Sequence, residues 1–248
     1  MLEEAKRIVE EGAKSGIVLR LLGGLAVKYY CPSASHCTLS REYPDMDLMG
    51  LSDQSRKMQE LFVNLGYTAD EVFNMMQGDL RLLFLDSRDR HVDIFLDIFD
   101  MCHKFDFRDR LALTDFAISI SDLLITKLQI AELNEKDVKD ILSILLDNQI
   151  GHNDSAKTIN AKYIADLCSH EWGVYKTFTI TLNSVLSSMN KYGLGPENEK
   201  AVRSRINELL VEIESKPKSA RWKIRARLGE KKAWYALPEN PTVKMKVR

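Results

Sequence analysis

Residues 21–50 read LLGGLAVKYYCPSASHCTLSREYPDMDLMG, and this stretch decides the fold, because a glycine pair follows one apolar segment and an Asp-x-Asp pair opens the next. The apolar run at 17–22 predicts a buried strand. Gly23 and Gly24 then predict a turn into a helix over 25–30, whose first backbone N–H groups are free to bind an anion. The glycines therefore indicate either a phosphate site or an ordinary tight turn.

Asp45 and Asp47 open the second apolar segment. Residues two apart on a strand point to the same face, with their Cα atoms about 6.6 Å apart. Two carboxylates at that spacing can share hard cations such as Mg²⁺. The alternative is a solvated strand edge or turn.

A third carboxylate, Asp93, lies within an apolar segment further along the chain. The apolar runs at 79–86 and 91–99 are joined by four polar residues and predict a β-hairpin. Burying a lone carboxylate in such a strand costs several kcal/mol unless it is paired or bound to a cation. Asp93 is thus a candidate metal ligand. The alternative is a structural ion pair with one of three arginines, Arg41, Arg81 or Arg90.

The apolar period becomes helical from residue 121, where Ser121 or Asp122 is the expected N-cap. Lys127 lies among apolar residues of this predicted helix, so its ammonium either extends to solvent or faces an anion. Asp137 and Asp140 share one face of the next helix, which Asn134 is expected to cap. A solvated helix face would show the same pattern. Further helices are expected at 160–169, 172–191 and 197–214.

Charge is divided unevenly along the 248 residues. Residues 216–248, the basic C-terminal segment, carry 11 Lys/Arg against two Glu, a net of +9, so the remaining chain carries −10 of the total −1. This segment interleaves Trp222, Trp234 and Tyr235 with basic residues, a mixture that can hold a nucleic-acid backbone and stack bases. The alternative is that its tryptophans pack on the acidic body.

The composition favours a cytoplasmic protein with two domains. A chain of this length with 45% hydrophobic residues can bury a large core. Its acidic N-terminus lacks the pattern of a signal peptide, and no run approaches about 18 apolar residues, so no membrane association is expected. The four cysteines form no C-x-x-C pair and are expected to be reduced. A zinc site at Cys31, His36 and Cys37 is disfavoured because no second ligand pair follows.

The combination of motifs resembles the nucleotidyltransferase superfamily, in particular the AbiEii-type abortive-infection and toxin-like branch. The matching residues are GG-x-A at 23–26, Arg41 ahead of Asp-Met-Asp at 45–47, and Val-Asp-Ile-Phe at 92–95. The resemblance implies an α/β fold, with a mixed sheet and flanking helices followed by a mostly helical C-terminal domain. We expect an α/β catalytic domain at 1–118, a helical domain at 119–215 and the basic segment at 216–248.

The same resemblance implies a role for each candidate residue. Asp45, Asp47 and Asp93 would hold two Mg²⁺ ions, with Asp93 also able to take the acceptor's proton. Gly23 and Gly24 would bind the β- and γ-phosphates. Lys127 and Arg41 would neutralise the triphosphate. Lys127 followed by Lys136-Asp137-x-x-Asp140 resembles that branch, which adds Asp137 and Asp140 to the nucleotide-binding residues.

The implied reaction moves a nucleoside monophosphate from an NTP to an acceptor hydroxyl and releases pyrophosphate. An RNA end such as that of tRNA is the expected acceptor, because of the basic segment. A toxin role with an antitoxin protein as partner follows only by analogy. Two alternatives stay open: a nucleotide- or nucleic-acid-binding module without turnover, and an enzyme that modifies a small molecule such as an antibiotic.

Overall fold

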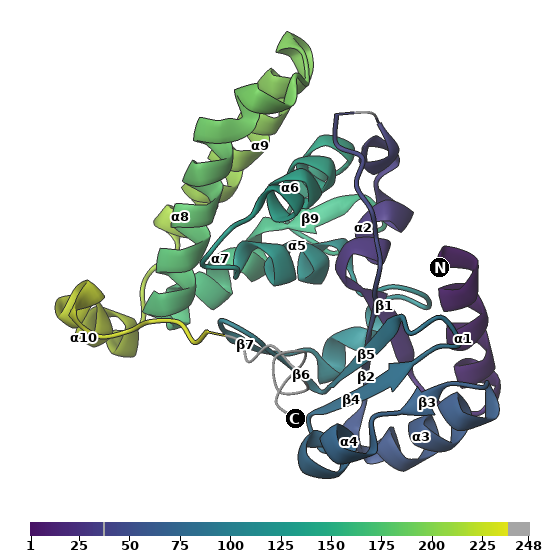
Figure 1. The fold of residues 1–248 in the computed structure, drawn as a ribbon. Coiled ribbons are helices and arrows are strands. Elements are labelled where there is room, and N and C mark those ends of the chain that lie inside the picture. The colour runs from purple at the N-terminus through teal and green to yellow at the C-terminus, as the bar shows by residue number, and fades with distance from the viewer. Residues whose placement is uncertain (37, 238–248) are drawn as a thin grey trace, which may run out of the picture.

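The computed structural model describes residues 1–36 and 38–237, and its sheet has five strands (Figure 1). In spatial order the strands are β1 (Leu19–Leu22), β2 (Met46–Gly50), β5 (His91–Leu96), β4 (Arg81–Leu85) and β3 (Thr68–Ala69). The β2–β5 pair is parallel and the other pairs are antiparallel. The predicted α/β class with a mixed sheet and flanking helices is therefore confirmed, as is the hairpin formed by β4 and β5.

The helices form two groups, one beside the sheet and one that extends away from it (Figure 1). The first group consists of α1 (Leu2–Lys14), α3 (Ser55–Asn64) and α4 (Glu71–Gln77). The second group comprises α2 (Gly23–Tyr30), α5 (Ile120–Leu128), α6 (Glu135–Asp147), α7 (Ala161–His170), α8 (Trp172–Ser188), α9 (Pro196–Ser215) and α10 (Ala220–Leu228). Two short two-stranded sheets complete the fold: β6 (Ile98–Asp100) with β7 (Lys104–Asp106), and β8 (Gln149–Gly151) with β9 (Thr158–Asn160). Within the described residues, no helix combines the length and apolar character needed to cross a membrane.

The strand register gives the two faces of the sheet different roles. Leu48 lies opposite Ile94, and both are fully buried in the hydrophobic core. One step back along the same strands, Asp47 lies opposite Asp93. Because side chains alternate between faces, the two carboxylates share the face opposite to Leu48 and Ile94.

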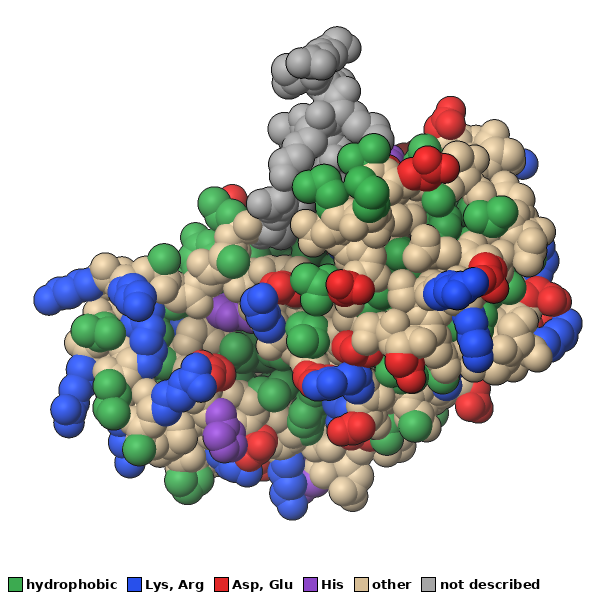
Figure 2. Space-filling model, turned by 90° about the horizontal axis from the view of Figure 1, so that it is seen from below, with side chains coloured by type: hydrophobic (Ala, Val, Ile, Leu, Met, Phe, Trp, Pro, Cys, Tyr) green, Lys and Arg blue, Asp and Glu red, His purple; other side chains and the backbone are tan. Residues whose placement is uncertain are grey.

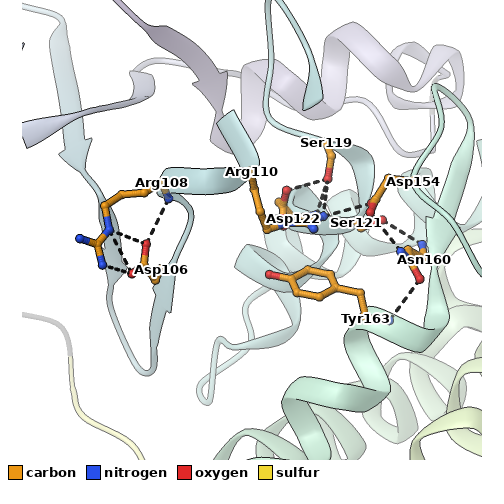
Figure 3. Close-up of polar contacts among 9 residues, drawn as sticks. All are labelled: Asp106, Arg108, Arg110, Ser119, Ser121, Asp122, Asp154, Asn160 and Tyr163. Atoms are coloured by element: carbon orange, nitrogen blue, oxygen red, sulfur yellow. Dashed lines mark hydrogen bonds and ion pairs between the residues drawn. The ribbon is translucent and has the colours of Figure 1, made fainter. Parts of the chain in front are cut away.

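The start of α5 differs from the sequence prediction (Figure 3). The N-cap is Ser119, whose Oγ accepts the N–H of Asp122 at 3.2 Å and donates to the Asp122 carboxylate at 2.7 Å. Ser121, one of the two predicted caps, instead accepts the N–H of Asn160 through its Oγ at 2.8 Å. The prediction was wrong because the helix begins at Ile120, so that Ser121 and Asp122 lie inside it; Ser121 binds the distant Asn160, and Asp122 binds the cap residue Ser119. The predicted cap of α6, Asn134, is confirmed together with a capping box.

Arg110 links the segment after the sheet to the helical part (Figure 3). Its guanidinium forms ion pairs with Asp122 on α5 and, at 3.1 Å, with Asp154 in the loop between β8 and β9. It also stacks on the ring of Tyr163 from α7, 3.7 Å from the ring centroid. Since every member has a partner, we interpret this network as structural.

His103, between β6 and β7, gives a prediction for the pH dependence of stability. Its Nε2 lies 2.8 Å from Thr177 Oγ1 on α8, and burial lowers the pKa of His103 to about 4. A histidine with a lowered folded-state pKa contributes stability above its ordinary value near 6.5, and this contribution is lost as the pH falls through 4. We expect the wild type to lose about 2 kcal/mol from this group between pH 7 and pH 4. His103→Gln should lack that loss of stability in urea titrations. If the variant showed the same pH dependence as the wild type, His103 would not be the group responsible.

Candidate functional site

The centre of the candidate site is the acidic pair, Asp47 on β2 and Asp93 on β5. These residues are direct neighbours across parallel strands, and Asp93 is 8% exposed. Burial, followed by the charge of Asp93, raises the pKa of Asp47 to about 7, although Lys127 and Arg81 act in the opposite direction. Two carboxylates this close favour either a shared proton or an added cation.

Gly23 provides the space in which the Asp47 carboxylate lies. Its backbone is left-handed, with φ +68°, and a Cβ atom there would be 2.0 Å from Asp47 Oδ2. Any other residue would therefore collide with the carboxylate and strain the backbone. The sequence analysis expected a phosphate site or a tight turn at the glycine pair; in the structure, the group next to Gly23 is the carboxylate of Asp47 from β2.

Gly24 provides a second space, occupied by Arg41. A Cβ atom at Gly24 would lie 2.1 Å from Arg41 Nη2. The Arg41 guanidinium is also held over the ring of Tyr43, 4.1 Å from its centroid. The segment before β2 thus brings Arg41 to the beginning of α2.

Gly24→Ala should displace Arg41, because the added methyl group occupies the position of its guanidinium. The lost ion pair is offset in part by the higher helix propensity of Ala, so we expect a net loss of about 1 kcal/mol. The position of Arg41 is expected to affect nucleotide affinity more strongly, by about tenfold. Gly12→Ala is the matched control, since its new Cβ would lie 3.2 Å from the flexible Leu19 Cδ1. Thermal melts and nucleotide titrations of both variants test this; equal effects would contradict it.

Asp140 on α6 holds two cations of the candidate site together. Its carboxylate accepts Arg41 Nε at 2.8 Å and Nη2 at 2.7 Å, and it pairs with Lys127 Nζ at 2.7 Å. Asp140 is 1% exposed. The predicted residues Lys127, Arg41 and Asp140 thus form one cluster, and the charge of Lys127 also acts on Asp47.

Asp137 lies at the margin of this cluster. Its Oδ1 is 4.0 Å from Lys127 Nζ, and its N–H is bound by Asn134 in the capping box of α6. Its clearest contact is therefore with the helix end rather than with the other candidate residues.

Arg81 on β4 is the residue that the sequence prediction left outside the site. Its Nε donates to Asp93 Oδ1 at 2.6 Å, and its Nη2 binds Oδ2 of the same carboxylate. Of the three arginines considered as partners for Asp93, the structure thus selects Arg81; Arg41 binds Asp140, and Arg90 binds Asp86 and Glu4.

The hairpin register could have revealed this contact. Leu83 lies opposite Asp93, so Arg81 shares the face of Asp93 and stands diagonally across from it. Once the turn between the strands is known, the alternation of side chains along both strands predicts that Arg81 and Asp93 are neighbours.

The donor chemistry of the acidic pair suits Mg²⁺, a hard cation that prefers carboxylate oxygens. Asp45 is exposed just before β2, and Asp93 is bound to Arg81. Within residues 1–36 and 38–237, no group of three or more His, Cys, Asp or Glu side chains is arranged as metal ligands. Asp47 and Asp93 would hold a cation, and the charge of Asp45, two residues before Asp47, also acts on the Asp47 carboxylate.

The basic C-terminal segment is described as far as residue 237. Trp222 packs edge-on against Tyr175, and Trp234 packs against Trp172. These two tryptophans therefore pack on the body, as in the alternative interpretation of the sequence. Figure 2 shows Lys and Arg side chains gathered at the end of the molecule where α10 lies. The exposed basic residues there are Arg221, Lys223, Arg227, Lys231 and Lys232. Lys244, Lys246, Arg248 and Cys37 lie outside the described residues.

No family model matches this chain, and no curated protein matches its sequence. Several solved structures resemble it, among them the following two. One is a lincosamide antibiotic adenylyltransferase, LnuA, with lincomycin bound: identity is 16%, the match covers 56% of this chain and 92% of that chain, and the TM-score is 0.40. The other is the antibiotic-resistance factor ANT(2'')-Ia, with 12% identity, coverage of 86% and 93%, and a TM-score of 0.36. Likenesses at this level do not establish a family for the chain.

Proposed function

We propose that this chain is a Mg²⁺-dependent nucleotidyltransferase, an enzyme of the EC 2.7.7 type. The observation that carries the proposal is the acidic pair on β2 and β5, with Asp47 against Gly23 at the start of α2, and with Arg41 and Lys127 held together by Asp140. Nucleotidyl transfer spreads negative charge over the moving group, so catalysis requires positioning and positive charge. This arrangement offers a cation site and two fixed cations on neighbouring elements.

The chain's own residues would act as follows. Arg41 and Lys127 bind the triphosphate, and the N–H groups at Gly23 and Gly24 donate to its oxygens. Two Mg²⁺ ions held by Asp45, Asp47 and Asp93 would neutralise the phosphates and make the acceptor hydroxyl more acidic. The acceptor oxygen attacks the α-phosphorus, its proton passes to Asp93, and the bond to the β-phosphate oxygen breaks so that pyrophosphate leaves. Asp137 supports the nucleotide site through the end of α6.

The acceptor we favour is an RNA end such as that of tRNA, supported by the exposed basic residues of α10 and the segment after it. A toxin role, with an antitoxin protein as partner, stays an analogy within this proposal. The second candidate acceptor is a small hydroxylated molecule, including an antibiotic. A cavity of about 970 Å³ between α6 and α8 has polar walls that include Asn134, Lys139 and Ser184, but none of the residues proposed to hold the metal or the triphosphate lines it.

One experiment separates these functions. The full chain is incubated with Mg²⁺, each α-labelled NTP, and either total RNA or a panel of hydroxylated antibiotics. We expect label on RNA, its loss in Asp45→Ala and in Asp47→Asn, and its loss in an Arg221→Glu/Lys223→Glu double variant. Label on a small molecule that survives the double variant supports the second acceptor. NTP binding in calorimetry without pyrophosphate release supports a binding module and contradicts the proposal.

A further inference from the structure

Arg81 engages both oxygens of a proposed metal ligand. Its Nε and Nη2 bind separate oxygens of Asp93 in the bidentate arrangement that guanidinium and carboxylate groups favour. Both partners are largely removed from water, with side-chain exposures of 19% for Arg81 and 11% for Asp93. A cation approaching Asp93 therefore meets a carboxylate whose oxygens are already hydrogen-bonded.

The charges of the acidic pair and Arg81 explain why a guanidinium lies there. The Arg81 guanidinium pairs with Asp93 and lies on the face of the sheet that Asp93 shares with Asp47. Arg81 thus partly neutralises both acids. A divalent cation would neutralise them fully, so the two kinds of cation compete for the same carboxylates.

Two aromatic rings lie beside the Arg81 guanidinium. The guanidinium carbon lies 4.5 Å from the ring centroid of Phe95 and 6.0 Å from that of Phe73 on α4. Because the Arg81 side chain is long and has several rotatable bonds, it can leave Asp93 without a change in the backbone of β4, and the adjacent rings offer its guanidinium cation–π contacts.

We propose that Arg81 competes with the divalent cation for Asp93 and thereby sets the affinity of the site for metal. The metal binds only as the guanidinium moves away. This inference rests on the proposed function, because it takes the acidic pair to be the metal site. Arg81 would then control the metal concentration at which the site becomes able to catalyse transfer. The opposing interpretation is a fixed structural ion pair that metal does not disturb.

Binding of Mn²⁺ to the full chain, measured by the loss of the free-ion paramagnetic resonance signal, tests the inference without nucleotide or turnover. Arg81→Gln is expected to bind Mn²⁺ at least about tenfold more tightly than the wild type, since the competing charge is removed. Arg90→Gln is the matched control: Arg90 is 25% exposed and forms ion pairs with Asp86 and Glu4, and it should leave Mn²⁺ affinity unchanged. The Arg81→Gln/Asp93→Asn double variant should lose the increase in Mn²⁺ affinity.

Arg81→Lys covers the case in which Arg81→Gln does not fold, because it keeps the charge but loses the bidentate contact; about threefold tighter binding is expected. Equal or weaker Mn²⁺ binding by the folded Arg81 variants, or no Mn²⁺ binding by any variant, overturns the inference. The proposed function fails separately, if the labelled-NTP assay shows no transfer. If Arg81→Gln binds Mn²⁺ more tightly than the wild type but the wild type shows no transfer, the inference about Arg81 holds and the proposed nucleotidyltransferase function is wrong.

Discussion

Asp47→Asn is expected to abolish nucleotidyl transfer while making the protein more stable. The variant keeps the shape of the side chain but loses a charge that faces Asp93, so the proposed metal site loses a ligand and activity falls by at least about 100-fold. The free energy of unfolding, in contrast, is expected to increase. The pKa of Asp47 is raised to about 7, so the folded protein holds this proton more tightly than the unfolded chain does.

The sign of the stability change follows from this raised pKa. The contribution of the Asp47 proton is present at low pH and is lost as the pH rises through 7. Asn does not titrate. The free energy of unfolding of the variant, relative to that of the wild type, should therefore increase by about 2 kcal/mol between pH 5 and pH 8. Urea titrations at both pH values, without metal, measure the difference. A variant that is destabilised at pH 8, or that retains transfer, would show that Asp47 is a structural residue.

Asp140→Ala is expected to have the largest effect on folding among the candidate residues. The substitution leaves Arg41 and Lys127 without their shared partner in a buried position, and breaking a buried ion pair from one side costs about 3–5 kcal/mol. Because both cations are then free to move, nucleotide affinity should also fall, by at least about tenfold.

Asp137→Ala is the matched control on the same helix. Asp137 contributes to the capping box of α6 and lies 4.0 Å from Lys127, so its loss should cost about 1 kcal/mol, typical of a cap. Denaturant titrations and calorimetric NTP titrations of both variants give the comparison. Similar losses in the two variants would mean that Asp140 does not organise the cations.

Local patterns in the sequence predicted much of the acidic face. Side chains alternate along 91–99, so the sequence predicts that Asp93 and Ile94 point to opposite faces of the strand, and the register agrees. The parallel pairing of β2 with β5 was not readable, since it joins segments more than 40 residues apart whose contact depends on the whole sheet. That pairing sets Asp47 beside Asp93.

The burial of polar residues on helices was harder to predict. Asp140 follows a spacing that is equally typical of a solvated face, yet it is buried because Arg41 arrives from a loop about 100 residues away. Arg81 was considered only as one of three partners for Asp93. Its selection depends on the register of a hairpin whose turn length the sequence leaves open within a residue or two.

The most direct test of the account is a crystal of the full chain soaked with Mn²⁺ and a non-hydrolysable NTP, followed by anomalous diffraction. The account predicts an anomalous peak about 2.2 Å from carboxylate oxygens of both Asp47 and Asp93, with Arg81 turned away and the triphosphate beside Arg41 and Lys127. A bound nucleotide elsewhere, or no peak at the acidic pair with Arg81 still on Asp93, would contradict it.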